Sequence, residues 1–161
     1  MAEPALELIG TYVASGSPSS VSFTSIPADY KHLRLELWCS SLAARTWYVT
    51  LNNDTAYVYI FRSLLFSTSL SNSNSTGSNF GVYAHRSGGN GGTTIDIKNY
   101  ADTVTYKNIS ARGGDYGGNG VHTEGMYDYN EGTITAVNRV DFSATTAIND
   151  GSTFALFGAK G

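Results

Sequence analysis

The chain has 161 residues, of which 14% are charged, and its net charge is −3. A chain of this length can form one hydrophobic core, so we expect a single domain over residues 1–161. Clustered Lys and Arg, which nucleic acid requires, are lacking. No apolar run approaches the roughly 20 residues that cross a membrane as a helix. Neither nucleic acid nor a membrane is therefore expected as a partner.

The cysteine content and the N-terminal sequence bear on the compartment. Cys39 is the single cysteine, so no disulfide can form within the chain, and we expect a small buried side chain and not a reactive thiol. Met1–Pro4 lacks the basic start of a signal peptide, and no apolar stretch follows it. The sequence therefore predicts a protein that is made and kept in a cytoplasm, or assembled there and released by lysis.

Alternation of apolar and polar residues predicts several short strands in the first part of the chain. The clearest is Lys31–Cys39, where every second residue from Leu33 to Leu37 is leucine. The residues that point to the opposite face are His32, Arg34, Glu36 and Trp38. Arg34 and Glu36 are neighbours on that face and are expected to pair modestly at the surface. The other strands expected here are Ala5–Ala14 with an interruption or bulge at Gly10, Val21–Phe23, Thr46–Leu51 and Ala56–Phe61.

Three polar stretches divide the middle of the chain. Ser67–Asn79 has almost no apolar content and is expected to be an exposed loop, too long for a tight hairpin. Ser87–Gly92 and Gly113–Gly120 are rich in glycine and are expected to be a turn and a loop. Strands are expected at Phe80–His85, Thr93–Lys98, Val104–Ala111 and Val121–Asn130, and short turns at Asn52–Asp54 and Asn99–Asp102.

The C-terminal stretch Thr133–Gly161 is predicted to form two strands joined by a turn. From Ile134 to Phe142 the even-numbered residues are mostly apolar, as in a half-buried strand. Asn149–Gly151 has the composition of a turn. Ser152–Gly158 is apolar on both faces, so it is expected in the interior of a sheet, or in a sandwich whose second face is covered by another chain.

These patterns together predict the fold class. No segment shows helical periodicity over ten residues, and about ten short strands alternate with polar turns. The expected fold is all-β, an antiparallel β-sandwich of jelly-roll-like type.

Three stretches of the chain carry a family resemblance. They are Ser20–Leu37 (SVSFTSIPADYKHLRLEL), Ile95–Gly114 (IDIKNYADTVTYKNISARGG) and Gly151–Gly161 (GSTFALFGAKG). Together they resemble β-sandwich proteins that are common in tailed bacteriophages, in particular marine and cyanobacterial ones. The resemblance implies a virion component: a head decoration, a fibre or a tail adhesin. The Ser/Asn run Thr68–Ser78 departs from the pattern, and its role stays open.

Residues with catalytic chemistry do not form a recognisable site. Gly113–Gly120 lacks the Lys-Ser/Thr pair and the helix of a phosphate-binding loop. Glu124 and Asp128 are the one carboxylate pair worth naming for glycoside hydrolysis, and solvated charges are the better interpretation. The histidines lack metal-ligand spacing; they are His32, His85 and His122. With no Gly-x-Ser-x-Gly elbow either, no enzyme, catalytic residue, cofactor or metal is expected.

Aromatic residues and the loops are the candidates for contacts. A set of six aromatic residues could stack on carbohydrate, contact another subunit or form plain core: Trp47, Tyr48, Tyr57, Tyr59, Tyr127 and Tyr129. Loops on a rigid sandwich are where binding usually resides, and Ser, Asn, Gly and Tyr suit adaptable contacts. The candidate contact residues are Tyr57, Tyr59, Phe61, Tyr116, Asn119, Tyr127 and Tyr129.

The function expected from this reasoning is structural and non-enzymatic, in a phage virion. A capsid decoration or cement protein on the particle surface is favoured. The alternative is a receptor-binding module of a tail or head fibre that binds a host surface glycan, and a glycan-active enzyme is disfavoured. Other capsid or tail proteins are the expected partners. A homo-oligomer is also expected, because strands with two apolar faces exceed what one small sandwich can bury, and the resemblance favours a trimer.

Overall fold

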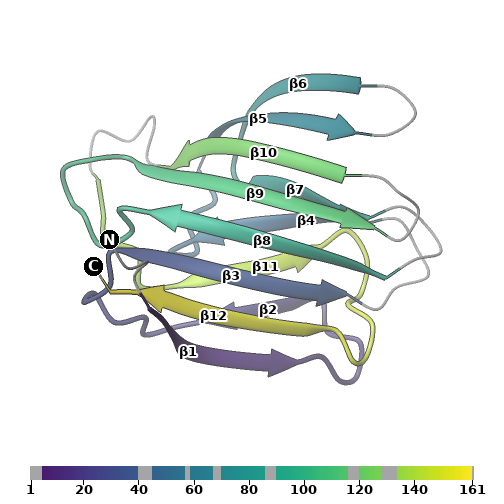
Figure 1. Ribbon diagram of the computed structural model, residues 1–161, viewed down its shortest axis with the longest axis horizontal. Helices are drawn as coiled ribbons and strands as arrows, with labels where there is room; N and C mark the ends of the chain where they lie inside the picture. The colour runs from purple at the N-terminus through teal and green to yellow at the C-terminus, as the bar shows by residue number, and fades with distance from the viewer. Residues whose placement is uncertain are drawn as a thin grey trace.

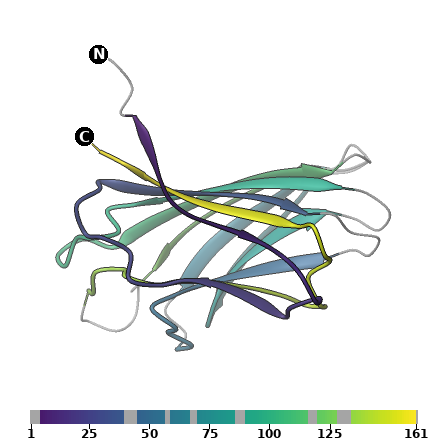
Figure 2. The same cartoon turned by 90° about the horizontal axis from the view of Figure 1, so that it is seen from below.

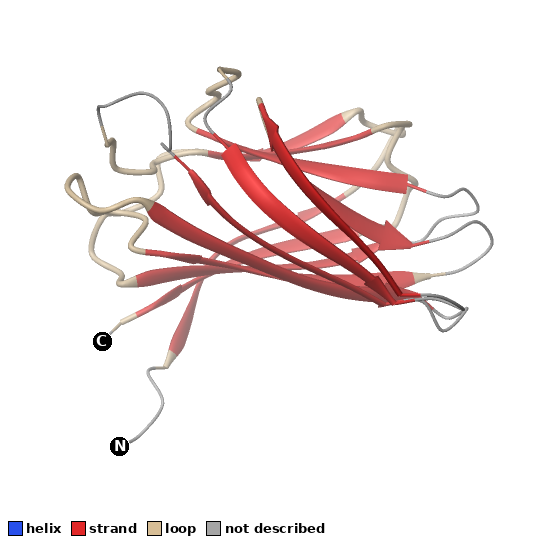
Figure 3. Cartoon of the chain, turned by 90° about the horizontal axis from the view of Figure 1, so that it is seen from above, coloured by secondary structure: helices blue, strands red, loops and turns tan. Residues whose placement is uncertain are grey.

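A computed structural model describes residues 5–39, 45–56, 59–66, 70–85, 90–115, 120–127 and 134–160. All twelve elements within these segments are β-strands (Figure 3). No helix in this part of the chain is long and apolar enough to cross a membrane.

Eight strands form the larger sheet, and each hydrogen-bonded pair in it is antiparallel. In spatial order they are β1 (Leu6–Val13), β12 (Thr153–Ala159), β3 (His32–Cys39), β8 (Gly91–Lys98), β9 (Lys107–Asp115), β10 (Gly120–Tyr127), β5 (Tyr59–Phe66) and β6 (Leu70–Gly77). β1 and β6 therefore form its two edges (Figure 1).

Four antiparallel strands form the smaller sheet. In spatial order they are β2 (Ser20–Phe23), β11 (Val140–Ala144), β4 (Arg45–Leu51) and β7 (Phe80–His85). The two sheets lie one above the other (Figure 2). The predicted all-β, jelly-roll-like antiparallel sandwich is confirmed, with twelve strands in the described segments where about ten were expected.

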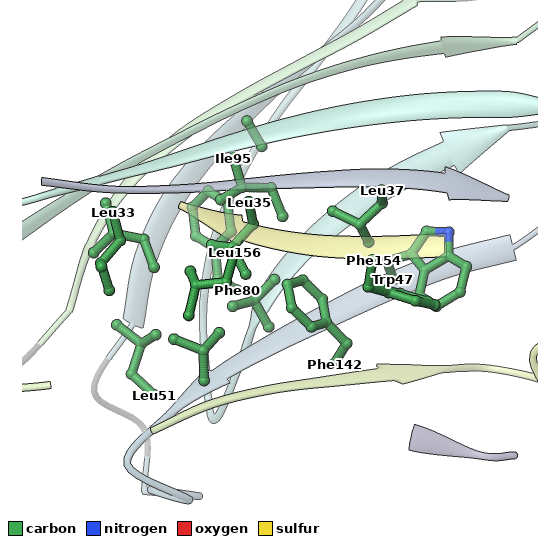
Figure 4. Packing of buried hydrophobic residues seen from close by; sticks show 14 of the residues in the cluster. Leu33, Leu35, Leu37, Trp47, Leu51, Phe80, Ile95, Phe142, Phe154 and Leu156 are labelled. Carbon is green, nitrogen blue, oxygen red and sulfur yellow. The ribbon is translucent and has the colours of Figure 1, made fainter. Parts of the chain in front are cut away.

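The core lies between the two sheets and follows from the alternation along their strands. On β3 the side chains of Leu33, Leu35 and Leu37 are buried, as predicted. On β4, across the interface, Trp47 and Leu51 are buried against them (Figure 4). Cys39 is buried too, in agreement with its expected role as a small core residue.

Phe154 on β12 is at the centre of an aromatic cluster. Its ring centroid lies 5.6 Å from that of Trp47, 5.7 Å from that of Phe142 and 6.3 Å from that of Tyr12. These separations are those of favourable edge-to-face and tilted aromatic pairs. β12 runs between β1 and β3, so the expectation that this strand lies in the interior of a sheet is confirmed.

The predicted turns and the predicted bulge are also present. The register of β1 against β12 shifts between Leu8 and Gly10, which is the bulge expected at Gly10. Asn52 and Asn99 have positive φ angles of 55° and 57°, in turns that suit asparagine. Gly151 has φ 79° in the turn before β12, a conformation that glycine adopts without strain.

The expectation of a loop over Ser67–Asn79 is wrong for residues 70–77, and residues 67–69 lie outside the described part of the chain. β6, Leu70–Gly77, pairs along its length with β5. An edge strand gains its ladder of backbone hydrogen bonds from one neighbour, and polar side chains are common on such strands. The Ser/Asn composition therefore marked an edge strand and not a loop. Likewise, Gly113–Gly120 is not a loop throughout, because its first residues belong to β9 and Gly120 begins β10.

One strand begins later than predicted because a turn precedes it. β9 starts at Lys107 and not at Val104, whose side chain is 79% exposed. The Asp102 carboxylate accepts hydrogen bonds from the backbone N–H of Val104 (2.6 Å) and from the hydroxyl and N–H of Thr105 (2.7 and 3.2 Å). These bonds lower the pKa of Asp102, the Thr105 hydroxyl having the largest effect, and they hold the segment as a turn.

The strand predicted from Thr133 begins only at Val140. Residues 134–139 are held instead by the side chain of Asn52. Its amide nitrogen donates to the carbonyl of Ala136 (2.9 Å), and its amide oxygen accepts from the N–H of Asn138 (3.0 Å). Val137, an odd-numbered residue, is buried against the predicted alternation.

Candidate functional site

The candidate site lies on the outer face of the larger sheet, the face away from the smaller sheet, which is turned toward the reader in Figure 1. Side chains opposite to the buried ones on β3, β8, β9 and β12 point to this face. Trp38 on β3 is a large aromatic residue among them, and 54% of its surface is exposed. An exposed tryptophan on an interior strand of a sheet is unusual, because its burial would be strongly favourable.

The strand register places small residues on both sides of Trp38. It lies opposite Gly92 on β8 and Thr153 on β12. A methyl group added at Gly92 would lie 3.3 Å from Cε3 of the indole, so the ring rests against the sheet above this glycine. The glycine therefore allows the ring to lie low on the sheet while staying exposed.

The next cross-strand row carries charged groups. Glu36 lies opposite Thr94, and Thr94 lies opposite Arg112 on β9. Within the described segments neither Glu36 nor Arg112 has an ion pair or a hydrogen bond of its side chain. Both are exposed, so their donors and acceptors are available to a ligand.

These residues form a shallow groove of about 380 Å³, here called the Trp38 groove. Its main lining residues are Glu36, Trp38, Gly92, Thr94, Arg112 and Thr153. An apolar ring beside a carboxylate, a guanidinium and two hydroxyl groups can hold a molecule that has both an apolar surface and many hydroxyls.

A second groove of about 580 Å³ lies on the same face at the other end of β3. It is lined by Leu6, His32, Leu33, Arg34, Asp96, Lys98 and Ala159. Arg34 does not pair with Glu36, as was expected, but with Asp96 on β8, at 2.7 and 3.2 Å. Asp96 lies directly opposite Arg34 in the register, so the cross-strand partner is closer than the residue two positions along the strand.

A polar cluster joins the two ends of the chain on the other side of the sheet. Lys160 Nζ lies 2.8 Å from Glu7 Oε2 and 5.4 Å from the centroid of the Tyr30 ring. The Tyr30 hydroxyl donates to Glu7 (3.2 Å). The hydrogen bond from Lys160 lowers the pKa of Glu7, and the same bond raises the pKa of Lys160. All three groups are partnered, so this cluster is structural.

One residue expected to make contacts lies in the core. Tyr59 is 1% exposed, and its phenolic oxygen accepts a hydrogen bond from the N–H of Leu51 (2.6 Å). This corrects the expectation for Tyr59, which cannot contact a partner from that position. Its hydroxyl is hydrogen-bonded within the core. The sequence alone does not distinguish a tyrosine buried in this way from one that faces a partner.

The other predicted contact residues are not brought into the candidate site by the described structure. Phe61 lies on β5 and Tyr127 on β10, and the description of both is limited to the backbone. Outside the described residues lie Tyr57, Tyr116, Asn119 and Tyr129. These six remain predictions.

The three histidines considered for chemistry lie on separate strands. His32 lies on β3, His85 on β7 and His122 on β10, and Glu124 lies on β10 while Asp128 lies outside the described residues. In the described part of the chain, no three His, Cys, Asp or Glu residues are grouped as metal ligands would be.

Sequence reasoning placed Trp38 and Glu36 on an outward face without identifying a site there. A tryptophan on the polar side of a strand was the available signal. Arg112 carried no such signal, because its place beside Glu36 depends on the register of three strands.

No family model matches the chain, and no curated protein matches its sequence. Among solved structures, the chain is similar to a tetrameric galectin from Cinachyrella sp. (ball sponge), at 11% identity and a TM-score of 0.42 over 88% of this chain and 99% of that one. For the Caenorhabditis elegans galectin LEC-6 the identity is 10% and the TM-score 0.42, over 94% and 96%.

A mutant of the alginate lyase Aly36B in complex with an alginate tetrasaccharide is similar at 10% identity and a TM-score of 0.36, over 99% of this chain and 98% of the lyase. At such identities and scores, these similarities carry no argument about function.

Proposed function

We propose that this protein is a non-enzymatic saccharide-binding protein of a tailed bacteriophage particle, acting as a receptor-binding module. The observation that carries the proposal is the exposed Trp38 ring beside Glu36 and Arg112, two charged side chains without partners in the described segments. The assignment to a virion rests on the resemblance of Ser20–Leu37, Ile95–Gly114 and Gly151–Gly161 to phage β-sandwich proteins.

The chemistry of a sugar matches the Trp38 groove. A pyranose ring presents an apolar face of C–H groups and a rim of hydroxyls. The indole offers a flat surface for the C–H face. The carboxylate of Glu36 accepts hydrogen bonds from two hydroxyls, and the planar guanidinium of Arg112 donates several, and such charge-assisted bonds are stronger than neutral ones.

We propose binding without cleavage because the described part of the Trp38 groove has fewer carboxylates than glycoside hydrolysis needs. Glycoside hydrolysis ordinarily uses two carboxyl groups about 5–9 Å apart on either side of the bond. Among the described residues that line the Trp38 groove, Glu36 is the one carboxylate. Asp96, in the neighbouring groove, is engaged by Arg34.

The test is a saccharide-binding measurement on Trp38→Ala. We expect wild-type protein to bind host surface polysaccharide, and the variant to bind at least about tenfold more weakly, a loss of about 1.4 kcal/mol. Tyr106→Ala is the matched control, because Tyr106 is an exposed aromatic residue outside the groove. Equal binding by wild type and Trp38→Ala would overturn the proposal, and so would the absence of binding to any host saccharide.

A second candidate function is a capsid decoration or cement protein. It is favoured by the apolar edge, which we define as Leu6, Leu8 and Val13 on β1. Leu8 and Val13 are 58% and 61% exposed on a sheet edge, a combination that suits a contact with another protein. We expect a decoration protein to bind particles that lack it and to raise their thermal stability. Failure to bind such shells would exclude this candidate.

A further inference from the structure

The two grooves of the outer face lie along the same strand. β3 contributes to both, with Trp38 in one groove and His32 in the other. These residues are six positions apart, which at ~3.3 Å per residue corresponds to roughly 20 Å along the strand. The two grooves therefore follow one another along β3 and β8. Together, here called the trough, they extend over more than a single sugar ring requires.

The charges of the side chains that line this trough do not sum to zero. Arg34 and Asp96 neutralise each other in their two-bond pair. Lys98 and Arg112 have no ion pair in the described segments, and Glu36 is the one acidic lining residue without a partner there. The trough thus has an excess of positive charge, although the whole chain has a net charge of −3.

We infer that the trough binds an extended saccharide that carries carboxylate or sulfate groups. This inference rests on the proposed function and names its ligand class. One sugar unit stacks on Trp38 with its hydroxyls at Glu36 and Arg112. A unit further along the strand places its acidic group at Lys98, which lies opposite His32 in the register.

The features of the trough favour an acidic saccharide over nucleic acid, which is the other extended anion. Two unpaired cations are few for a polymer with a phosphate at every unit. A single exposed aromatic ring does not provide the successive stacking surfaces that single strands use. The hydroxyls of Thr94 and Thr153 suit a ligand rich in hydroxyl groups.

The test compares matched acidic and neutral probes. One pair is a hexamer of galacturonic acid and its carboxyl-reduced, neutral counterpart, and the other is dextran sulfate and dextran. We expect the acidic member of at least one pair to bind tenfold or more tightly than its neutral counterpart, with a preference that weakens as salt is raised. The pair that shows the preference distinguishes a carboxylate from a sulfate ligand.

Variants separate this inference from the proposed function. Lys98→Ala is expected to remove most of the acidic preference and to keep binding to the neutral saccharide. Trp38→Ala weakens both. Lys31→Ala is the matched control, because Lys31 is an exposed lysine that does not line either groove.

The binding results show whether the inference alone fails or the proposed function fails with it. Saccharide binding that depends on Trp38 but shows no acidic preference would leave the proposed function standing and overturn this inference. An acidic preference that Lys98→Ala leaves unchanged would also overturn it, as would equal or tighter binding of a single-stranded oligonucleotide. If neither probe pair binds but host surface polysaccharide does, the inference fails and the proposed function stands; if none of these saccharides binds, both fail.

Discussion

Gly158 on β12 occupies a position where the packing leaves no room for a side chain. A Cβ atom added there would lie 2.3 Å from Cγ of Tyr30, whose ring covers the strand. Tyr30 cannot easily move, because its N–H donates to the hydroxyl of Tyr100 (3.1 Å) and its own hydroxyl donates to Glu7 (3.2 Å). The glycine is therefore required by a close approach and not by a turn.

We expect Gly158→Ala to lower the free energy of unfolding by about 1–3 kcal/mol, the usual cost of overpacking. Chemical denaturation would measure it. Gly10→Ala is the matched control, because its Cβ would meet Phe23 at 3.4 Å, which is ordinary contact. Equal stability of the two variants would contradict this expectation, because the ring of Tyr30 would then move aside without a cost in free energy.

At the scale of elements, hydrogen bonds of Asn52 stabilise the segment before β11, where a strand was predicted and none forms. Besides the bonds of its side chain to Ala136 and Asn138, its backbone N–H donates to the carbonyl of Arg139 (2.9 Å). Asn52 thus binds the segment that leads into β11 at three points, and backbone bonds of Val137 to Tyr100 and of Ile26 to Asn138 hold it as well. Its positive φ of 55° turns the chain so that the amide faces that segment.

We expect Asn52→Ala to reduce the free energy of unfolding by about 1–3 kcal/mol, because polar backbone groups at 136 and 138 lose their partner. Asn53→Ala is a close control, since Asn53 has nearly the same φ, 56°, and is exposed. Thermal or denaturant unfolding of both variants decides the matter, and equal losses would show that the turn conformation alone is responsible.

The elements differ in how far the sequence predicts them. β3, β8 and β12 each bury at least one apolar face in the core of the sandwich. Apolar residues at alternate positions therefore predicted where each of these strands lies. β6 is held by backbone bonds to β5, and the segment before β11 by a distant amide. Neither interaction leaves a periodic pattern in the local sequence, so both segments were predicted wrongly.

The candidate site was predictable only within one strand. Alternation placed Trp38 and Glu36 on the same outward face, because both lie on β3. The contributions of Thr94 and Arg112 depend on how β3, β8 and β9 are aligned, which many distant contacts fix together. Tyr59 on β5 was predicted wrongly for a related reason, since its hydroxyl is bonded to the backbone of β4.

At the scale of the whole molecule, the larger sheet has two different edges. β1 carries the apolar edge, whereas the sequence of β6 is rich in Ser and Asn (Figure 1). The apolar edge and the two grooves lie on the same outer face, because Leu6 and Leu8 pair with Ala159 and Phe157 of β12, next to β3. Association through this edge would place several binding troughs in one assembly, and linked sites can exceed single-site affinity by about 10²–10⁴.

We therefore expect the protein to be a homo-oligomer that depends on the apolar edge, a trimer of about 52 kDa if three copies of the 17.2 kDa chain associate. Replacing both Leu8 and Val13 by Ser should shift the mass from light scattering toward that of the single chain, because the gain from burying their apolar surface is lost. Val104→Ser is the control, since Val104 is 79% exposed on a loop. A wild-type protein that stays at 17.2 kDa at micromolar concentration would contradict the homo-oligomer. An oligomer unaffected by the double substitution would place its interface elsewhere.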